Sequence, residues 1–290
     1  MSKRGQIQQH LQKLGEIGDV MRAIKNISLM ETYKLNRFLE YQHRVVSGIE
    51  AAVKDFARHY SPFESVSPDA GIVLAIGSER GLCGDFNDSV ASAVQLYLED
   101  NSGVPPKIMV VGNRLAAKLG GDGRIFPAIE GASVVEEIQP LLSLVMKKLT
   151  EMHVEATGQL PLHLTVYSHQ EGKDGVTVQV VSAVPAQAQE TRPEPYPPML
   201  LLPAQAFHYE LVKHYLWAQM HHLFYSSLMA ENHFRLQHME RAIQRMEEKS
   251  GELQRKQNII RQEEITEEIE VIMLNNDMMR VRAQKAAADD

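Results

Sequence analysis

Residues 236–260, LQHMERAIQRMEEKSGELQRKQNII, decide the fold of this chain. Apolar side chains recur there at alternating spacings of three and four, and Ser250 and Gln257 fill the two polar steps of the same stripe. This heptad pattern is typical of a helix that packs against a partner in a coiled coil. The stripe lies within residues 205–287, which contain no proline and a single glycine, Gly251. We therefore expect one very long C-terminal helix.

The stripe changes after Ile260. It shifts by one position and continues at Ile265, Ile269, Ile272 and Met279. Such a shift turns an apolar stripe to a different side of the helix. We therefore expect this end of the helix to contact a partner other than the one along residues 236–260.

A second long helix is expected at the start of the chain. Residues 6–60 contain no proline, and apolar residues from Leu35 to Tyr60 keep heptad spacing. The two helices should form an antiparallel hairpin in which residues 7–21 lie beside residues 236–253. The second helix should extend past the first by about twenty residues, since helical residues rise at a constant step.

The prolines divide the chain. All thirteen lie between Pro62 and Pro203, and proline stops or breaks a helix. We therefore expect three parts: a coiled-coil helix at 1–61, an α/β insert with a proline-rich connector at 62–203, and a coiled-coil helix with a charged tail at 204–290.

The insert has the pattern of a small α/β domain. Two apolar runs, residues 71–77 and 107–112, predict buried strands, and a helix capped by Asp88 or Ser89 lies between them. Further along we expect a helix at 113–119, a short strand at 124–126, a helix at 133–157 that includes or is divided at Pro140, and a hairpin of 160–168 with 176–184. The predicted fold class is thus α/β: a long antiparallel coiled coil with an inserted Rossmann-like domain.

Composition narrows the possible functions. The net charge of −7 argues against nucleic acid as the main partner, and the absence of any run of eighteen apolar residues argues against a membrane-spanning helix. The single cysteine excludes an internal disulfide framework. Charge is uneven, because the first helix is basic while residues 263–270 carry an acidic band.

No motif predicts catalysis or a cofactor. The loop GSERGLCG at residues 77–84 follows a strand, but it lacks the Lys-Ser/Thr pair of a phosphate-binding loop and the spacing of a dinucleotide fingerprint. Cys83 has no histidine near it in sequence, so we interpret it as a small buried thiol. The C-terminal helix carries six histidines, none of them four residues from another, so no helical zinc pair is expected.

Read together, these segments resemble the γ subunit of rotary F-type ATP synthases. Residues 20–27, VMRAIKNI, are similar to the family's ITKAMKMV, and residues 78–87, SERGLCGDFN, to its signature SDRGLCGGLN. Glu231, Arg235 and Met239 fit the family's S-E-x-x-x-R-M-x-x-M, and residues 261–269, RQEEITEEI, fit R-Q-x-x-I-T-x-E-L/I. Asp85, Phe86 and the charged end of the chain depart from the family pattern, and a divergent, alternate F-type ATPase, such as a sodium-translocating one, fits equally well.

The resemblance implies a rotor, or central stalk, with no catalytic site, cofactor or metal of its own. Its partners would be the α and β subunits of the catalytic hexamer, the ε subunit and the ring of c subunits, at the cytoplasmic face of the bacterial inner membrane. It also implies partner contacts at Arg22, Ile24, Lys25, Arg261, Gln262, Ile265, Ile269 and Ile272.

Two other functions remain open from the sequence. Paired terminal helices also suit a coiled-coil structural or assembly protein. The insert could instead serve a nucleotide-binding enzyme, although its glycine loop matches no nucleotide pattern. ATP hydrolysis by the isolated chain would distinguish that enzyme from the other two.

Overall fold

The computed structural model describes residues 3–60, 72–100, 107–120, 128–157, 163–170, 176–182, 196–197 and 199–286. Contacts divide the chain into two units. Unit 1 consists of residues 1–25 and 239–290, and unit 2 of residues 26–238. This division falls inside the two long helices, whereas the domain boundaries expected from the prolines fall at their ends.

The two long helices are present where the proline-free stretches predict them. Helix α1 spans Lys3–His59 and helix α5 spans Ala204–Ala286. Proline sets the start of α5, because the carbonyl oxygen of Pro203 accepts the backbone N–H of Phe207 at 2.9 Å. Pro203 itself thus stands just before the helix, where its missing N–H costs no helical hydrogen bond.

In unit 1 the two helices run side by side in opposite directions. Lys25 Nζ lies 2.8 Å from Glu240 Oε1, and Arg4 Nη1 lies 3.3 Å from Glu264 Oε2. Gly18 is buried, and a Cβ at this position would meet the Met246 methyl at 3.4 Å. The expected stripe on α5 faces inward, since its members Leu236, Met239, Ile243, Met246, Leu253 and Ile260 are all buried or half-buried.

The pairing register agrees with the expected one in part. Gly18 faces Met246, and these residues lie within the segments 7–21 and 236–253 that were expected to pair. Arg4 faces Glu264, however, so the first residues of the segment 7–21 lie opposite a part of α5 beyond Leu253. The helices do end level at the insert, since the Phe56 ring packs on Phe207. The expected segment of α5 was therefore placed too close to the insert.

Unit 2 is built on a four-stranded sheet in the order β2-β1-β3-β4. The strands are β1 (Ile72–Ile76), β2 (Lys107–Val111), β3 (His163–His169) and β4 (Val176–Ser182). Strand β1 pairs in parallel with both β2 and β3, and β3 pairs antiparallel with β4. The two buried strands and the hairpin predicted from the sequence are thus present.

The helical elements that accompany the sheet in the described part of the chain are α2 (Phe86–Asp100), α3 (Asn113–Leu119), the 3-10 turn η2 (Val135–Glu137) and α4 (Ile138–Thr157). We expected Asp88 or Ser89 to cap α2. The helix begins earlier, at Phe86, so neither residue is its cap. The Ser89 hydroxyl instead bonds the Asp85 carbonyl at 3.0 Å. Pro140 does not divide α4, because it lies in the first turn, where a helix tolerates proline.

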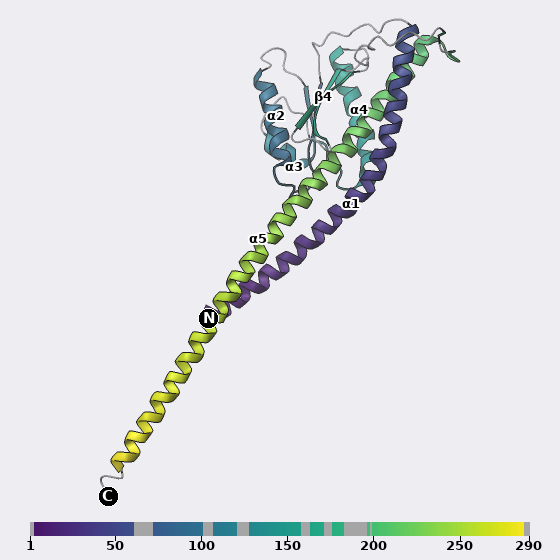
Figure 1. Ribbon diagram of the computed structural model, residues 1–290. Coiled ribbons are helices and arrows are strands. Elements are labelled where there is room, and N and C mark those ends of the chain that lie inside the picture. The colour runs from purple at the N-terminus through teal and green to yellow at the C-terminus, as the bar shows by residue number, and fades with distance from the viewer. Residues whose placement is uncertain are drawn as a thin grey trace. The chain divides into compact units, whose positions relative to one another are not determined.

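The sheet is covered on both faces (Figure 1). Alternate residues of β1 point in opposite directions: Val73 and Ala75 join the core with α2 and α3, while Ile72, Leu74 and Ile76 join the core with α4. The second core also contains Leu35 and Leu39 of α1 and a row of α5 residues from Leu216 to Met229. The long helices are therefore part of the core of unit 2.

Three sequence predictions fall outside the described residues. They are the short strand at 124–126, most of the proline-rich connector at 185–203, and the last residues of the charged tail, 287–290.

Candidate partner-binding surface

The partner residues expected on α5 are all exposed. Ile265, Ile269 and Ile272 have exposed fractions of 45%, 52% and 65%. Arg261 and Gln262 are also exposed and lie one turn earlier. At about 100° per residue, all five fall within an arc of about 100° on this continuous helix. The helix therefore places one guanidinium, one amide and three isoleucines on a single face.

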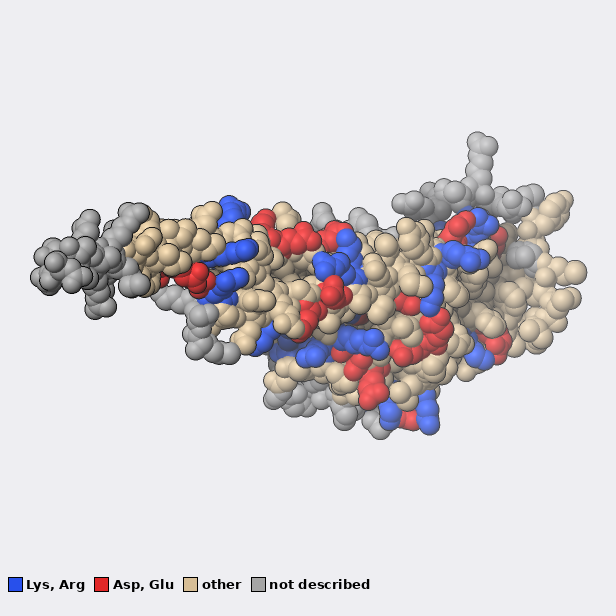
Figure 2. Space-filling view, turned by 90° about the horizontal axis from the view of Figure 1, so that it is seen from below, with Lys and Arg blue, Asp and Glu red and all other residues tan. Residues whose placement is uncertain are grey.

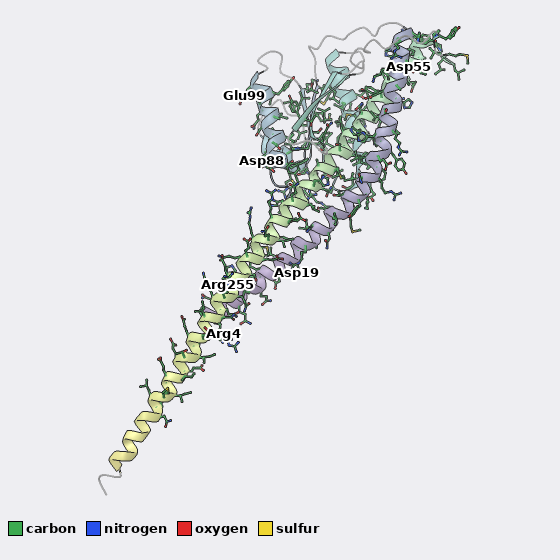
Figure 3. All side chains as sticks on the ribbon, in the orientation of Figure 1. Arg4, Asp19, Asp55, Asp88, Glu99 and Arg255 are labelled. Atoms are coloured by element: carbon green, nitrogen blue, oxygen red, sulfur yellow. The ribbon has the colours of Figure 1, made fainter. Side chains whose placement is uncertain are left out.

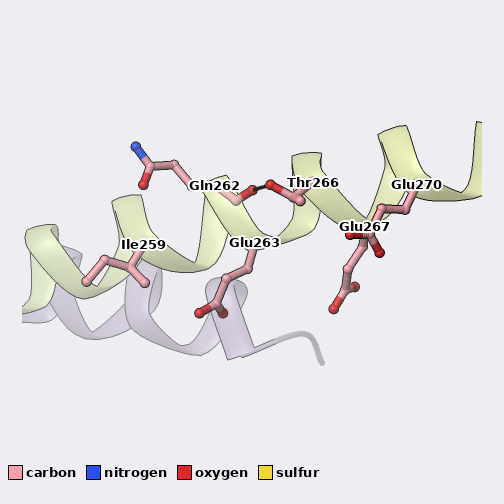
Figure 4. A pocket seen from close by; sticks show the side chains of 6 residues that line it. All are labelled: Ile259, Gln262, Glu263, Thr266, Glu267 and Glu270. Carbon is pink, nitrogen blue, oxygen red and sulfur yellow. Dashed lines mark hydrogen bonds between the residues drawn. The ribbon is translucent and has the colours of Figure 1, made fainter. Parts of the chain in front are cut away.

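A shallow acidic hollow lies on the adjoining face of α5 (Figure 4). Its lining is Ile259, Gln262, Glu263, Thr266, Glu267 and Glu270. The Thr266 hydroxyl donates to the Gln262 carbonyl oxygen at 2.9 Å, so the backbone of Gln262 is engaged while its amide group points outward. The hollow is lined mainly by polar side chains, and its carboxylates favour contact with a cationic group.

The expected residues on α1 are engaged within unit 1. Arg22 contacts Asp19 at 2.8 Å and Glu247 at 3.9 Å, and Lys25 contacts Glu240 at 2.8 Å. Ile24 is half-buried between them. These residues therefore hold the two helices together, and about half of the Arg22 side chain remains accessible.

The two groups of expected residues do not meet. Glu240, which faces Lys25, precedes Arg261 by 21 positions on one helix. At 1.5 Å per residue this is about 30 Å. They form two surfaces rather than one. Three exposed residues that the sequence analysis omitted, Val271, Met273 and Leu274, extend the outer surface. The apolar run VIML at 271–274 was the signal for them.

The glycine loop after β1 is closed by a buried polar network. Asn87 Nδ2 donates to Ser78 Oγ at 2.7 Å, and Asn87 Oδ1 accepts the Ser78 backbone N–H at 2.9 Å. Cys83 is 3% exposed, with its sulfur 3.4 Å from Ser78 Oγ. Burial raises the pKa of the Cys83 thiol. Cys83 is thus a buried thiol, as expected, and not an activated nucleophile.

A carboxylate fills the edge of the sheet at which open α/β folds bind ligands. Glu79 accepts backbone N–H bonds from Gly131 at 2.7 Å and Asn113 at 3.1 Å, and a side-chain bond from Asn113 at 2.6 Å. Burial alone would raise the pKa of Glu79, but these bonds outweigh it and lower the pKa. The backbone N–H groups of Gly131 and Asn113 at this edge are thus engaged by a carboxylate of the chain itself.

An ion pair on α5 is buried beside the same loop. Glu231 and Arg235 bond each other one helical turn apart, and Arg235 Nε donates to the Gly81 carbonyl oxygen at 3.4 Å. Burial raises the pKa of Glu231 to about 7, against the opposing effect of Arg235. The family-like residues of two distant segments thus contact each other.

Among the described residues no metal centre is evident, and the charges on the face drawn in Figure 2 are mixed. Among the described residues, no group of three or more His, Cys, Asp or Glu side chains is placed to hold a metal ion. Burial lowers the pKa values of His208, His221 and His222. Figure 2 shows cationic and anionic side chains interspersed on the face in view. Within the described part of the chain, no helix is both long and apolar enough to cross a membrane.

Solved structures share this fold. The central stalk and c-ring structure of the Tetrahymena thermophila mitochondrial ATP synthase includes a chain that is 14% identical, with a TM-score of 0.54, covering 77% of this chain and 99% of its own length. A chain of the Euglena gracilis mitochondrial ATP synthase rotor is 11% identical, with a TM-score of 0.57 and coverages of 90% and 98%. A chain of that organism's OSCP/F1/c-ring structure is 12% identical, with a TM-score of 0.57 and coverages of 97% and 95%. At these identities the likeness establishes the fold alone.

Sequence comparison establishes the family. No curated protein matched the chain by sequence. The family model described as ATP synthase matches residues 4–274, which is nearly the whole chain. The chain therefore belongs to the ATP synthase γ-subunit family, whose members are in general the non-catalytic rotor subunits of that enzyme.

Proposed function

We propose that this chain is the central-stalk rotor of a rotary F-type ATP synthase and couples ion flow through a ring of c subunits to ATP synthesis or hydrolysis in a hexamer of α and β subunits. Its own role is mechanical and non-catalytic. The ε subunit completes the set of partners, and the complex lies at the cytoplasmic face of the bacterial inner membrane. The coupling ion is a proton or sodium.

One observation carries the proposal: α5 extends well past the start of α1. Glu264 contacts Arg4, near the first residue of α1, and α5 continues to Ala286. Over this extension, isoleucines that a soluble helix would bury are exposed to between 45% and 65%. Exposed apolar stripes on a helix mark contacts with another protein. A stalk that enters a ring of partners requires such an end.

In this role the extension has two functions. Ile265, Ile269 and Ile272 turn in an apolar bearing at the top of the hexamer, while Arg261 and Gln262 hold a loop of one catalytic subunit. A guanidinium presents a planar fork of donors that suits a carboxylate. Because a rotor meets each catalytic subunit at a different angle, the contact biases one site at a time. This is coupling by differential affinity between states.

The remaining parts follow from the same role. Residues of the two helices form an antiparallel coiled coil, stiff enough to carry torque, and the α/β part is a Rossmann-like insert near the foot of the stalk, without a bound nucleotide. The accessible side of Arg22, Ile24 and Lys25 forms a second partner contact lower on the stalk. The absence of nucleotide binding is supported by Glu79, whose carboxylate already accepts two backbone N–H groups at the edge of the sheet.

Assembly tests the proposal. The tagged chain, expressed in the organism that encodes it, should co-purify with a hexamer of nucleotide-binding subunits. In the isolated hexamer with this chain, a probe attached to the chain should rotate when ATP is added. Purification as a self-associated filament, or ATP hydrolysis by the chain alone, would contradict the proposal and favour the structural or the enzymatic alternative.

A further inference from the structure

We propose that three side chains, Glu31, Glu79 and Arg235, form a polar bridge that fixes the α/β part of unit 2 to both long helices and keeps it from turning about them. The inference rests on the proposed rotor function, because only a rotor must carry torque between its α/β part and its helices. These are positioning residues, since each acts on the backbone of a neighbouring segment rather than on a partner subunit.

The bridge begins on α5. Arg235 Nε donates to the carbonyl oxygen of Gly81, in the glycine loop. The guanidinium is held in place on its other edge, where Nη1 donates to Asn232 Oδ1 at 3.2 Å and Nη2 pairs with Glu231. The side chains of Arg235 and Glu231 are 9% and 3% exposed. A guanidinium fixed at three nitrogens cannot follow the loop if the loop moves, so the loop is tied to α5.

The middle of the bridge is Glu79, two residues before Gly81. Its carboxylate accepts bonds from the backbone N–H groups of Gly131 and Asn113 and from the Asn113 amide. Glu79 therefore joins the glycine loop to the segment that precedes η2. One of the three bonds reaches Gly131 and two reach Asn113 at the start of α3, so the carboxylate holds the glycine loop against both segments.

The bridge ends on α1. Glu31 Oε2 accepts the backbone N–H of Val135 at 3.2 Å, and Glu31 is 6% exposed. Lys34 lies between Glu31 Oε1 and Glu136 Oε1, at 2.9 and 3.1 Å. The start of η2 and α4 is thus tied to α1 by a buried bond and a half-exposed one.

The bridge supplies resistance to rotation, which apolar packing alone does not supply. The core between the sheet and the two long helices resists separation, because apolar burial depends on area, but it is not directional. Hydrogen bonds weaken steeply when their angle changes. The route from α5 through Gly81, Glu79, Gly131 and Val135 to α1 contacts both helices, so a twist of the α/β part about either helix must break a bond.

The test uses the assembled hexamer with this chain, stalled with a non-hydrolysable ATP analogue. A rod-shaped probe is attached to α4 through Lys147→Cys, an exposed position, while the buried native thiol stays unlabelled. The angular spread of the probe reports how far the α/β part turns. Glu31→Ala and Glu79→Ala should each at least double the variance of the angle. Glu31→Gln keeps an acceptor oxygen for Val135 and should restore the wild-type variance.

Two further variants complete the design. Glu40→Ala breaks an exposed pair with Arg44 on the same helix, at 2.8 Å, and should leave the variance unchanged. Glu79→Gln replaces Glu79→Ala if the alanine variant does not assemble, and should raise the variance because one acceptor oxygen is lost. Equal variance in all assembled variants, or equal behaviour of Glu31→Ala and Glu31→Gln, would overturn the bridge. Absence of ATP-driven rotation in the wild type would instead overturn the proposed function.

Discussion

The Leu115 side chain of α3 occupies the space beside Gly77 at the end of β1. A Cβ built on Gly77 would stand 2.2 Å from Leu115 Cβ and 2.9 Å from Asn87 Oδ1. These distances are far below van der Waals contact, and all three residues belong to the packed edge of the sheet. The glycine at this position is therefore required by close packing, not by its backbone angles.

Gly77→Ala should accordingly destabilise the chain by about 1–3 kcal/mol, the range for an overpacked core. Gly48→Ala is the matched control, because Gly48 lies on α1 with nothing within 4 Å of its Cβ position. That substitution should stabilise the chain by about 0.5–1 kcal/mol, since alanine is the better helix former. Urea unfolding measures both. Equal effects of the two substitutions would contradict the packing argument.

Arg261→Ala should lower coupled ATP turnover in the assembled complex by about tenfold or more, because a charge-assisted hydrogen bond contributes about 1.5–3 kcal/mol. The isolated chain should fold normally, since Arg261 is exposed and, among the described residues, has no ion-pair partner. Arg255→Ala, an exposed arginine on the same helix (Figure 3), is the control and should have little effect. Normal turnover in a fully assembled Arg261→Ala complex would refute the contact.

The pairing of the helices in unit 1 can be tested by a zero-length crosslinker. It should join Lys25 to Glu240, whose charged atoms lie 2.8 Å apart. The product is identified by mass spectrometry, and Lys25→Arg should abolish it without affecting the fold. The pair Lys249–Glu252, also at 2.8 Å but within one helix, is the positive control. If only the control pair is joined, the register described here is wrong.

The Glu231 carboxyl should make stability depend on pH. Burial raises its pKa from the usual 4.5 to about 7 in the folded chain, so between these values the unfolded chain loses a proton that the folded chain keeps. Its contribution is therefore full below about pH 4.5 and is lost as the pH rises through about 7, amounting to at most about 3 kcal/mol. Glu231→Gln cannot ionise.

Denaturant unfolding at several pH values between 5 and 8 measures this contribution. The wild type should lose stability relative to Glu231→Gln as the pH rises. Glu40→Gln, at an exposed position, should keep the wild-type profile. Parallel profiles for the wild type and Glu231→Gln would mean that Glu231 is ionised throughout this range, as a simple ion pair with Arg235 would be.

The sequence predicted the elements better than their relations. Proline positions and apolar runs located the long helices and the strands to within a few residues, because both signals are local. The predicted start of α2 was wrong. Asp88 and Ser89 resemble helix caps, but the helix begins before them, and the Asp85 carbonyl oxygen already accepts the backbone N–H of Ser89. The register of the helix pair was right only in part, because Gly18 faces Met246 as expected, whereas Arg4 lies opposite Glu264, beyond the expected segment of α5.

The same limit applies to the site. The exposed face of Arg261, Ile265 and Ile272 could be predicted, because a shift of the heptad pattern within one helix can be read directly from the amino-acid sequence. The contact of Arg235 with Gly81 could not be predicted, since 154 positions separate the two residues. Glu79 stands at the acidic position of the signature-like segment 78–87, but its partners could not be predicted, since two of them are the backbone N–H groups of Asn113 and Gly131, which carry no sequence signal.

The contact between Arg4 and Glu264 has a consequence for how the protein is made. The two residues are 260 positions apart, so the part of α5 that pairs with the start of α1 is synthesised long after α1 itself. The sheet also waits, because one of its faces is covered by α5 residues such as Met220 and Leu223. Closing such distant contacts is slow, and apolar surface stays exposed in the meantime. Until α5 has been synthesised, the apolar residues of α1 and of the sheet that pack on it lack their cover, which is the condition that favours aggregation.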